Sequence, residues 1–206
     1  VHIPDKVSTI LDIGTGTGLI ALQLAQRCES DTIDALEIEP GSFEQAVENF
    51  ENSSWSDRLY CYHASLVEFQ SEMDERYDLI ICNPPFYNNS YPAQGEARNL
   101  ARQTERLDFE SLLKCTSSLL EADGTCAFIL PFDREDEFLN VAERHKLHAS
   151  RITRVKGTKD SPVKRSLMQL QRQKVELDLS DLTIETSRHV YTQDYTNLVK
   201  DFYLEM

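Results

Sequence analysis

A glycine-rich stretch, L-D-I-G-T-G-T-G-L from Leu11 to Leu19, constrains the fold of this chain most strongly. The apolar segment Thr9 to Ile13 before it has the pattern of a short strand, and the Leu, Ala and Gln of Leu19 to Arg27 after it predict an amphipathic helix. The glycines of the stretch are Gly14, Gly16 and Gly18. Without side chains, the backbone can turn sharply at these positions and pass close to a ligand. We therefore expect a strand, a ligand-binding loop and a helix in succession.

Strands and helices alternate along most of the chain. The expected strands are Thr9–Ile13, Thr32–Ile38, Arg58–His63, Tyr77–Cys82, Thr125–Leu130, Ile152–Lys156 and Ser166–Arg172. The expected helices are Leu19–Arg27, Ser42–Phe50, Phe109–Leu120 and Glu135–His145. This alternation implies right-handed crossovers in a doubly wound sheet, while a Lys-Asp-Ser-Pro turn makes the last two strands an antiparallel pair. The prediction is an α/β fold with a seven-stranded, mostly parallel sheet that ends in a C-terminal antiparallel hairpin.

Composition indicates one globular domain over residues 1–206, because 206 residues with 40% hydrophobic content can bury a sizeable core. The sequence has neither an apolar run of 18 residues nor a charged-then-apolar leader, so we expect a cytoplasmic protein that does not enter the membrane.

The chain begins at Val1 and enters a strand within a few residues, so we expect the natural protein to have a further N-terminal segment. The five cysteines lack C-x-x-C spacing, and His145 and His148 have no further ligand nearby in sequence, so we predict reduced thiols and no metal.

A second ligand signal follows the glycines. A dinucleotide fingerprint, G-x-G-x-x-G, would need a glycine where Leu19 stands, so the spacing here is different. Glu37, in D-A-L-E-I-E, stands about twenty residues beyond the glycines, where an acid that binds ribose hydroxyls is expected. A plain tight turn and a surface acid remain the alternative reading of these two signals.

The strand Y-D-L-I-I-C is followed by N-P-P-F, residues Asn83 to Phe86, which are poor material for a core. In a doubly wound sheet, this strand end lies at the cleft beside the first strand. The Asn83 side-chain oxygen and the Pro84 carbonyl can accept both protons of an exocyclic amino group and draw its nitrogen toward tetrahedral geometry. The prolines hold these acceptors in place, and Phe86 offers a ring face to a base swung out of its stack. The alternative is an ordinary Asn-Pro turn.

These motifs resemble those of the class I S-adenosylmethionine-dependent methyltransferases, and Asn-Pro-Pro-aromatic resembles the group that methylates amino nitrogens of adenine, guanine or glutamine. Within that group, the run from Leu11 to Met206 resembles the bacterial tRNA (adenine-N(6))-methyltransferases that act on the adenine beside the anticodon of a valine tRNA. Further support comes from A-V-E-N-F and from the closing Y-T-x-x-Y-x-x-L-x-x-x-F-Y-L. The resemblance implies a Rossmann-like fold, S-adenosylmethionine as cofactor and tRNA as substrate, with no obligate protein partner.

The resemblance also implies roles for individual residues. The cofactor would be bound by Asp12, Gly14, Thr15, Gly16, Gly18, Glu37, Ile38, Ser65, Leu66 and Asn83. The target base would be held by the catalytic set Asn83, Pro84, Pro85 and Phe86, with the loop from Tyr87 to Arg106 enclosing it. Ser65 departs from the family pattern, because an acid usually stands there to bind the cofactor's adenine amino group. A hydroxyl accepts a hydrogen bond more weakly than a carboxylate.

Charge is distributed unevenly along this acidic chain, which has a formal net charge of −14. The segment from Arg144 to Lys174 carries ten lysines and arginines against one acid, a local charge of +9. A local positive face can attract a polyanion even when the whole protein is acidic. The residues expected to contact RNA are Arg102, Arg154, Lys156, Lys164 and Arg165. A solvated hairpin is the alternative.

Other activities remain open at this point. A protein-glutamine N(5)-methyltransferase would use the same Asn-Pro-Pro-aromatic chemistry on a side-chain amide, without needing the basic segment. An rRNA guanine-N(2)-methyltransferase would differ only in details of the pocket. A non-catalytic RNA-binding or cofactor-binding module is a third alternative, and the intact set from Asn83 to Phe86 argues against it.

Overall fold

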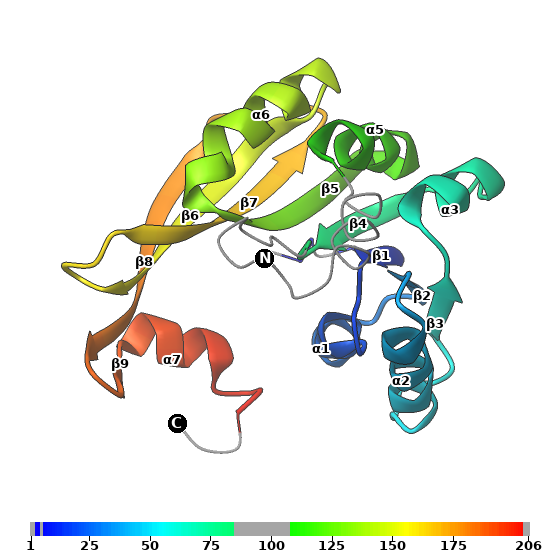
Figure 1. Cartoon of the computed structure of the whole chain (residues 1–206), viewed down its shortest axis with the longest axis horizontal. Helices are drawn as coiled ribbons and strands as arrows, with labels where there is room; N and C mark the ends of the chain where they lie inside the picture. The colour runs from blue at the N-terminus through cyan, green and yellow to red at the C-terminus, as the bar shows by residue number, and fades with distance from the viewer. Residues whose placement is uncertain (1–2, 5, 85–107, 204–206) are drawn as a thin grey trace, which may run out of the picture.

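The computed structural model describes residues 3–4, 6–84 and 108–203. Its strands are β1 Thr9–Ile13, β2 Thr32–Glu37, β3 Leu59–His63, β4 Tyr77–Cys82, β5 Leu120–Pro131, β6 His148–Thr158, β7 Val163–Gln171, β8 Asp178–Ser187 and β9 Val190–Tyr191 (Figure 1). Its helices are α1 Leu19–Arg27, α2 Pro40–Glu51, α3 Leu66–Glu72, α5 Phe109–Leu119, α6 Glu135–Arg144 and α7 Gln193–Val199, with a short 3-10 helix η1 at Phe132–Arg134. None of the helices in these ranges is long and apolar enough to cross a membrane.

All the strands in the described residues form one mixed sheet in the order β3-β2-β1-β4-β5-β7-β6-β8-β9. The strands from β3 to β5 are parallel, and β7 runs antiparallel to both β5 and β6. The predicted parallel sheet with an antiparallel hairpin is confirmed. The predicted number of strands is wrong, because the sheet has nine and not seven: β8 pairs with the outer edge of β6, and β9 pairs with β8.

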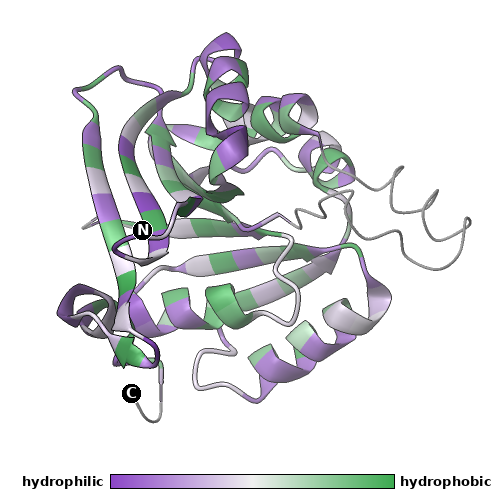
Figure 2. Cartoon of the chain, turned by 60° about the vertical axis from the view of Figure 1, so that its left-hand side comes forward, coloured by the Kyte–Doolittle hydropathy of each residue, from purple (hydrophilic) through white to green (hydrophobic). Residues whose placement is uncertain are grey.

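Helices cover both faces of the parallel part of the sheet. One apolar cluster joins β1, β2 and β4 to α1 and α2 through residues such as Leu24 and Phe50. The other joins the opposite face to α3, α5 and α6 through residues such as Leu112 and Phe138. The apolar run of β4 supplies both clusters, since Ile80 belongs to one cluster and its neighbours in sequence to the other. Figure 2 shows these hydrophobic strands between helices that have hydrophilic outer faces.

The C-terminal elements bend back toward the first helix. α7 packs beside β8, and the Arg27 guanidinium of α1 lies 6.0 Å from the centre of the Phe202 ring (Figure 1). All five cysteines are free, with three of them buried and two half-buried.

Candidate active site

Three segments of the predicted site follow neighbouring strands in register. Ile13 at the end of β1 pairs with Leu36 of β2 on one side and with Cys82 of β4 on the other. The next residues along the chain are therefore Gly14, Glu37 and Asn83, side by side at one edge of the sheet. β2 and β3 are added on one side of β1, and β4 and β5 on the other, so the strand order reverses at β1. In open α/β sheets, ligands bind in the crevice at such a point. We call this edge the catalytic rim.

The glycine-rich loop leaves space above the middle of the rim. Gly14 and Gly16 have φ angles of 69° and 61°, which side chains other than glycine rarely adopt. A Cβ atom at either position would meet no described atom within 4 Å, so this stretch of backbone is open to a ligand. Gly18 differs, because a Cβ there would collide with the Phe50 ring of α2. Glycine at position 18 therefore allows α1 to pack closely on α2, whereas Gly14 and Gly16 leave the loop accessible.

A buried carboxylate lies beneath this loop. Asp12 is fully buried, and the Thr15 hydroxyl donates to its Oδ2 at 2.6 Å. Its Oδ1 makes no hydrogen bond of ordinary geometry among the described residues, and the Ala21 N–H of α1 lies close enough to the carboxylate to lower its pKa. Burial raises the pKa of Asp12 from the ordinary 3.8 to about 6, while the bond from Thr15 acts in the opposite direction. An unpaired buried oxygen of this kind marks a place where a ligand can donate a hydrogen bond or bring a positive charge.

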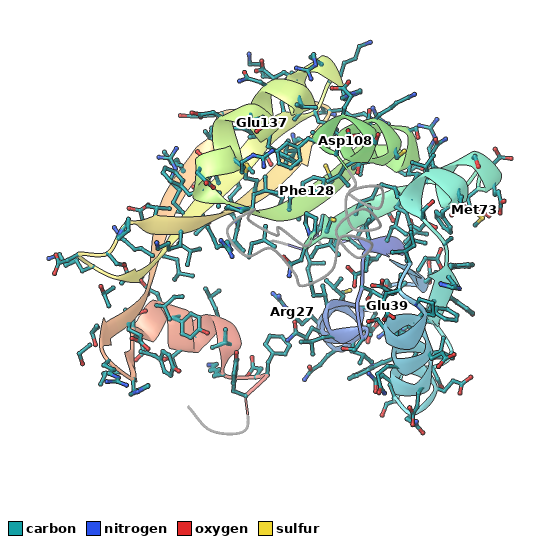
Figure 3. All side chains as sticks on the ribbon, viewed as in Figure 1. Arg27, Glu39, Met73, Asp108, Phe128 and Glu137 are labelled. Atoms are coloured by element: carbon teal, nitrogen blue, oxygen red, sulfur yellow. The ribbon has the colours of Figure 1, made fainter. Side chains whose placement is uncertain are left out.

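Glu37 connects the loop to the end of β2. Its Oε2 accepts from the Gly16 N–H at 2.8 Å, and its Oε1 accepts from Ile38 at 2.9 Å and from Glu39 at 2.8 Å. The surface-acid alternative is wrong, because only 9% of Glu37 is exposed. Ionised carboxylate oxygens have about four acceptor positions in all, so the three backbone donors leave capacity for a ligand hydroxyl. Ile38, beside it, presents an exposed apolar side chain. Figure 3 labels Glu39, where the chain passes from this corner into α2.

The end of β3 contributes a third corner. Ser65 caps α3: its hydroxyl donates to Glu68 Oε2 at 2.7 Å and accepts from the Glu68 N–H at 3.2 Å. Leu66 is buried in the core beneath it. Glu68 is an acid that sequence reasoning missed at this corner, although the capping-box spacing S-x-x-E was a signal that could have found it. The hydrogen bonds from Ser65 lower the pKa of Glu68, so an ionised carboxylate stands at the corner where the resemblance leads us to expect one at position 65.

The first two residues of the predicted target-base segment lie at the catalytic rim. Asn83 and Pro84 follow β4, and Asn83 is exposed while Pro84 is half-buried. Pro85, Phe86 and Arg102 lie outside the described residues. Two cavities of about 330 Å³ within the described part lie away from the rim, one between α3 and α5 and the other between α1 and α7. The described residues contain no group of three or more His, Cys, Asp or Glu side chains that could hold a metal.

Half of the basic residues in the +9 segment are paired within the protein. Arg144, Arg151, Arg154 and Lys156 form ion pairs with Glu110, Asp178, Glu135 and Asp181, and Arg172 donates to backbone carbonyls at the end of α5. Lys164 and Arg165 are exposed, and no ion pair holds them among the described residues. Because β6 runs parallel to β5, the β6–β7 hairpin that carries them projects from the catalytic rim.

Several relatives of this chain carry the same name. A protein of Christiangramia forsetii, "tRNA1(Val) (adenine(37)-N6)-methyltransferase", is 52% identical over 100% of this chain and 85% of its own length. A protein of the same name from Flavobacterium psychrophilum is 51% identical over 96% of this chain and 85% of its own length. The family described as "Methyltransferase small domain" matches residues 1–108. This chain belongs to the tRNA1(Val) (adenine(37)-N6)-methyltransferase family.

Solved structures of other methyltransferases share the fold of this family member. A predicted O-methyltransferase from Agrobacterium tumefaciens superposes with a TM-score of 0.76 at 19% identity, covering 96% of this chain and 90% of that one. A ribosomal protein L11 methylase from Lactobacillus delbrueckii subsp. bulgaricus gives 0.59 at 18% identity, covering 82% and 72% of the two chains. At these identities the likeness concerns the fold, and it confirms the predicted Rossmann-like class I methyltransferase architecture.

The rim of this methyltransferase fits S-adenosylmethionine, the methyl donor of class I methyltransferases. The space above Gly14 and Gly16 admits a ligand to the backbone, and Asp12 Oδ1 lacks a partner among the described residues. Glu37 retains acceptor capacity one strand away. A molecule with an ammonium group at its amino acid end and a ribose matches this sequence of groups along the rim.

Proposed function

We propose that this enzyme transfers the methyl group of S-adenosylmethionine to the exocyclic amino group of the adenine beside the anticodon of a valine tRNA. The observation that carries the proposal is the register of β2, β1 and β4, which sets Glu37, Gly14 and Asn83 side by side. Cofactor groups and base acceptors are thereby neighbours. The names of the relatives from Christiangramia forsetii and Flavobacterium psychrophilum support adenine in tRNA as the target.

The cofactor would lie along the rim from β4 to β3. In this arrangement Asp12, Thr15 and the loop glycines hold the amino acid end, and the carboxylate of Glu37 accepts from the ribose hydroxyls. Ile38 packs on the adenine, while Ser65 and the Leu66 N–H face its edge. Glu68 adds a carboxylate behind Ser65, which compensates in charge for the missing acid. The bound cofactor supplies an electrophilic methyl group on its sulfonium.

The base acceptors act on the amino nitrogen of adenine. Its lone pair is delocalised into the ring, so a nucleophile forms only when the nitrogen becomes more tetrahedral. The Asn83 amide oxygen and the Pro84 carbonyl would accept hydrogen bonds from its two N–H groups and favour that geometry. Pro85 would stiffen this segment, and Phe86 would stack on the extruded base. Positioning of nitrogen and methyl group in line then supplies most of the rate enhancement.

The β6–β7 hairpin would contact the tRNA backbone. Lys164 and Arg165 are the described cations best placed for phosphate, and Lys156 and Arg154 extend the same surface toward the sheet. Arg102 belongs to this set by sequence alone. We propose that the reaction takes place in the cytoplasm, in keeping with a tRNA substrate. We propose no protein partner, and one domain suffices for both binding functions.

Transfer of labelled methyl to separate pools of unmodified tRNA, ribosomal RNA and cell protein tests the proposal. After nucleoside digestion, we expect label as N(6)-methyladenosine from the tRNA pool alone. Label in protein would keep the Asn-Pro-Pro-Phe chemistry and replace the substrate with a glutamine amide. Label in guanosine of ribosomal RNA would equally overturn the assignment to tRNA adenine.

A further inference from the structure

An exposed aromatic side chain stands beside the base acceptors at the end of the next strand. Phe132 begins η1, directly after β5, and 37% of it is exposed. Cys82 of β4 pairs with Phe128 of β5, so both strands reach the catalytic rim together. With neighbouring strands about 4.8 Å apart and a rise of about 3.3 Å per residue, Phe132 is offset from Pro84 by one strand and two residues, or about 8 Å. Figure 3 labels Phe128 on this strand, beneath α5 and α6.

An immobilised cation stacks on this ring. The Arg154 guanidinium carbon lies 5.2 Å from the centre of the Phe132 ring. Glu135 holds the guanidinium from behind, with Nη2 to Oε1 at 2.6 Å and Nε to Oε2 at 3.4 Å. The Glu135 side chain is only 4% exposed and also accepts from the Ser166 hydroxyl. Arginine and ring are thus ordered before any substrate arrives, which lowers the entropic cost of binding to them.

The surroundings suit a single-stranded nucleic acid. Aromatic side chains stack on unpaired bases, and nearby cations attract the phosphates of the same strand. Arg165 pairs with Pro131 across β5 and β7, so this exposed cation stands at the same end of the sheet as Phe132. Its side chain leaves the opposite face of the sheet from that of its neighbour Ser166. By contrast, the exposed ring of Tyr60 lies on β3 at the far edge of the sheet, where no comparable cation contact exists among the described residues.

We propose that Phe132, backed by Arg154, is a stacking surface for an unpaired nucleobase that adjoins the target adenine in the same RNA strand. This role rests on the proposed function and adds to it a second base contact at the rim. Phe132 is a binding residue that fixes the register of the RNA, and Glu135 is a positioning residue that acts through Arg154. One base stacked here leaves its neighbour free to reach Asn83 and Pro84.

A purely structural role for Phe132 makes a different prediction about substitutions. If the ring only fills space against Arg154, the Phe132→Leu variant should keep most of its RNA affinity, because leucine is also a large apolar side chain. If the ring face binds a base, Phe132→Trp keeps RNA binding, while Phe132→Leu and Phe132→Ala lose it. Thermal unfolding of each variant identifies any loss of folding, and the leucine and tryptophan variants decide the question should Phe132→Ala be unstable.

The test uses anticodon stem-loop RNAs that carry 2-aminopurine on the 5′ or the 3′ side of the target adenine. We expect wild-type protein to quench one of the two probes. Phe132→Leu should abolish that quenching and raise the RNA Kd about 5- to 150-fold, since loss of one base–aromatic stack costs about 1–3 kcal/mol. KM should rise more than kcat falls, and S-adenosylmethionine binding should not change. Tyr60→Ala is the matched control and should resemble wild type.

Phe132→Leu with RNA affinity within about twofold of wild type and unchanged quenching would overturn the stacking role. Failure of the proposed function is distinguishable from this outcome. In that case the wild-type protein itself methylates none of these RNAs, whatever the variants do.

Discussion

At the scale of single residues, the proposed function assigns Asp12 to the cofactor and Asn83 to the base. Asp12 is buried beneath the glycine-rich loop with one oxygen unpaired among the described residues, whereas Asn83 is exposed on the next strand. Their neighbouring strands place them close together, yet their chemical tasks differ. Substitutions at the two positions should therefore change different measurements.

Asn83→Ala should leave S-adenosylmethionine binding nearly intact and lower single-turnover methyl transfer by a factor of about 10² to 10³, as loss of one preorganised polar group does in other enzymes. The reason is that the amide acts on the base. Calorimetry with the cofactor and single-turnover kinetics with tRNA measure the two effects separately. An equal loss of cofactor affinity and activity would refute the assigned role.

Protonation of Asp12 should make cofactor binding depend on pH. Burial raises its pKa to about 6, so the carboxylate that attracts a cationic group is present above pH 6 and is lost below it. S-adenosylmethionine affinity should thus rise between pH 5 and 7, and Asp12→Asn should bind more weakly without that rise. A pH profile of the variant that parallels the wild type would contradict this.

Protonation of Asp12 should stabilise the folded protein, although it weakens cofactor binding. A carboxyl with a folded-state pKa above its ordinary 3.8 binds protons more tightly when folded, so its contribution to stability falls as pH rises from about 4 to about 6. Asp12→Asn should therefore raise the free energy of unfolding at pH 8 in the absence of cofactor. Chemical denaturation at pH 4 and pH 8 would measure this, and a variant less stable at pH 8 would exclude the account.

The residues also show how far sequence reasoning reaches. Asp12, Glu37 and Asn83 were predictable because each lies at or next to the C-terminal end of an apolar strand, at a recognisable spacing. Glu68 was not predicted, because the family pattern leads us to expect the acid at position 65, which is a serine. Its carboxylate reaches that place through the first turn of α3, which depends on the capping geometry of a helix that was not predicted.

At the scale of elements, local pattern predicted the first strands and helices well, and long-range pairing decided the rest. β1, α1 and β4 have the predicted bounds because apolar periodicity and glycines define them. α3 has only seven residues, too few for a clear helical period. β8 is polar, with no buried residue, and exists because β6 offers it an unpaired edge. No local signal in its sequence specifies that partner.

The β6–β7 hairpin should carry the salt dependence of RNA binding. Reversing the charges of Lys164 and Arg165 to glutamate should weaken binding and reduce the slope of log K against log salt by about 1 to 2, because two phosphate contacts are lost. Lys174→Glu is the matched control, since it follows β7 at the opposite edge of the sheet. Equal effects of the two changes would mean that the attraction comes from the overall charge and not from the rim.

At the scale of the whole molecule, an acidic protein carries a local group of exposed cations on one hairpin. The net charge is −14, yet exposed cations gather on a hairpin that projects from the same edge as the cofactor and base groups. One sheet edge thus holds the proposed cofactor site near β1 and β2, the proposed base acceptors after β4, and the proposed RNA-facing surface after β5 and β6. With this arrangement, the groups proposed for methyl transfer and those proposed for RNA binding can contact the same substrate.

Methyl transfer to a single defined site tests the central claim most directly. Valine tRNA transcripts with adenine or guanine beside the anticodon would be incubated with enzyme and labelled S-adenosylmethionine, then digested to nucleosides. We predict about one methyl group per adenine transcript, recovered as N(6)-methyladenosine, and none in the guanine transcript. Equal labelling of both transcripts, or of neither, would contradict the account.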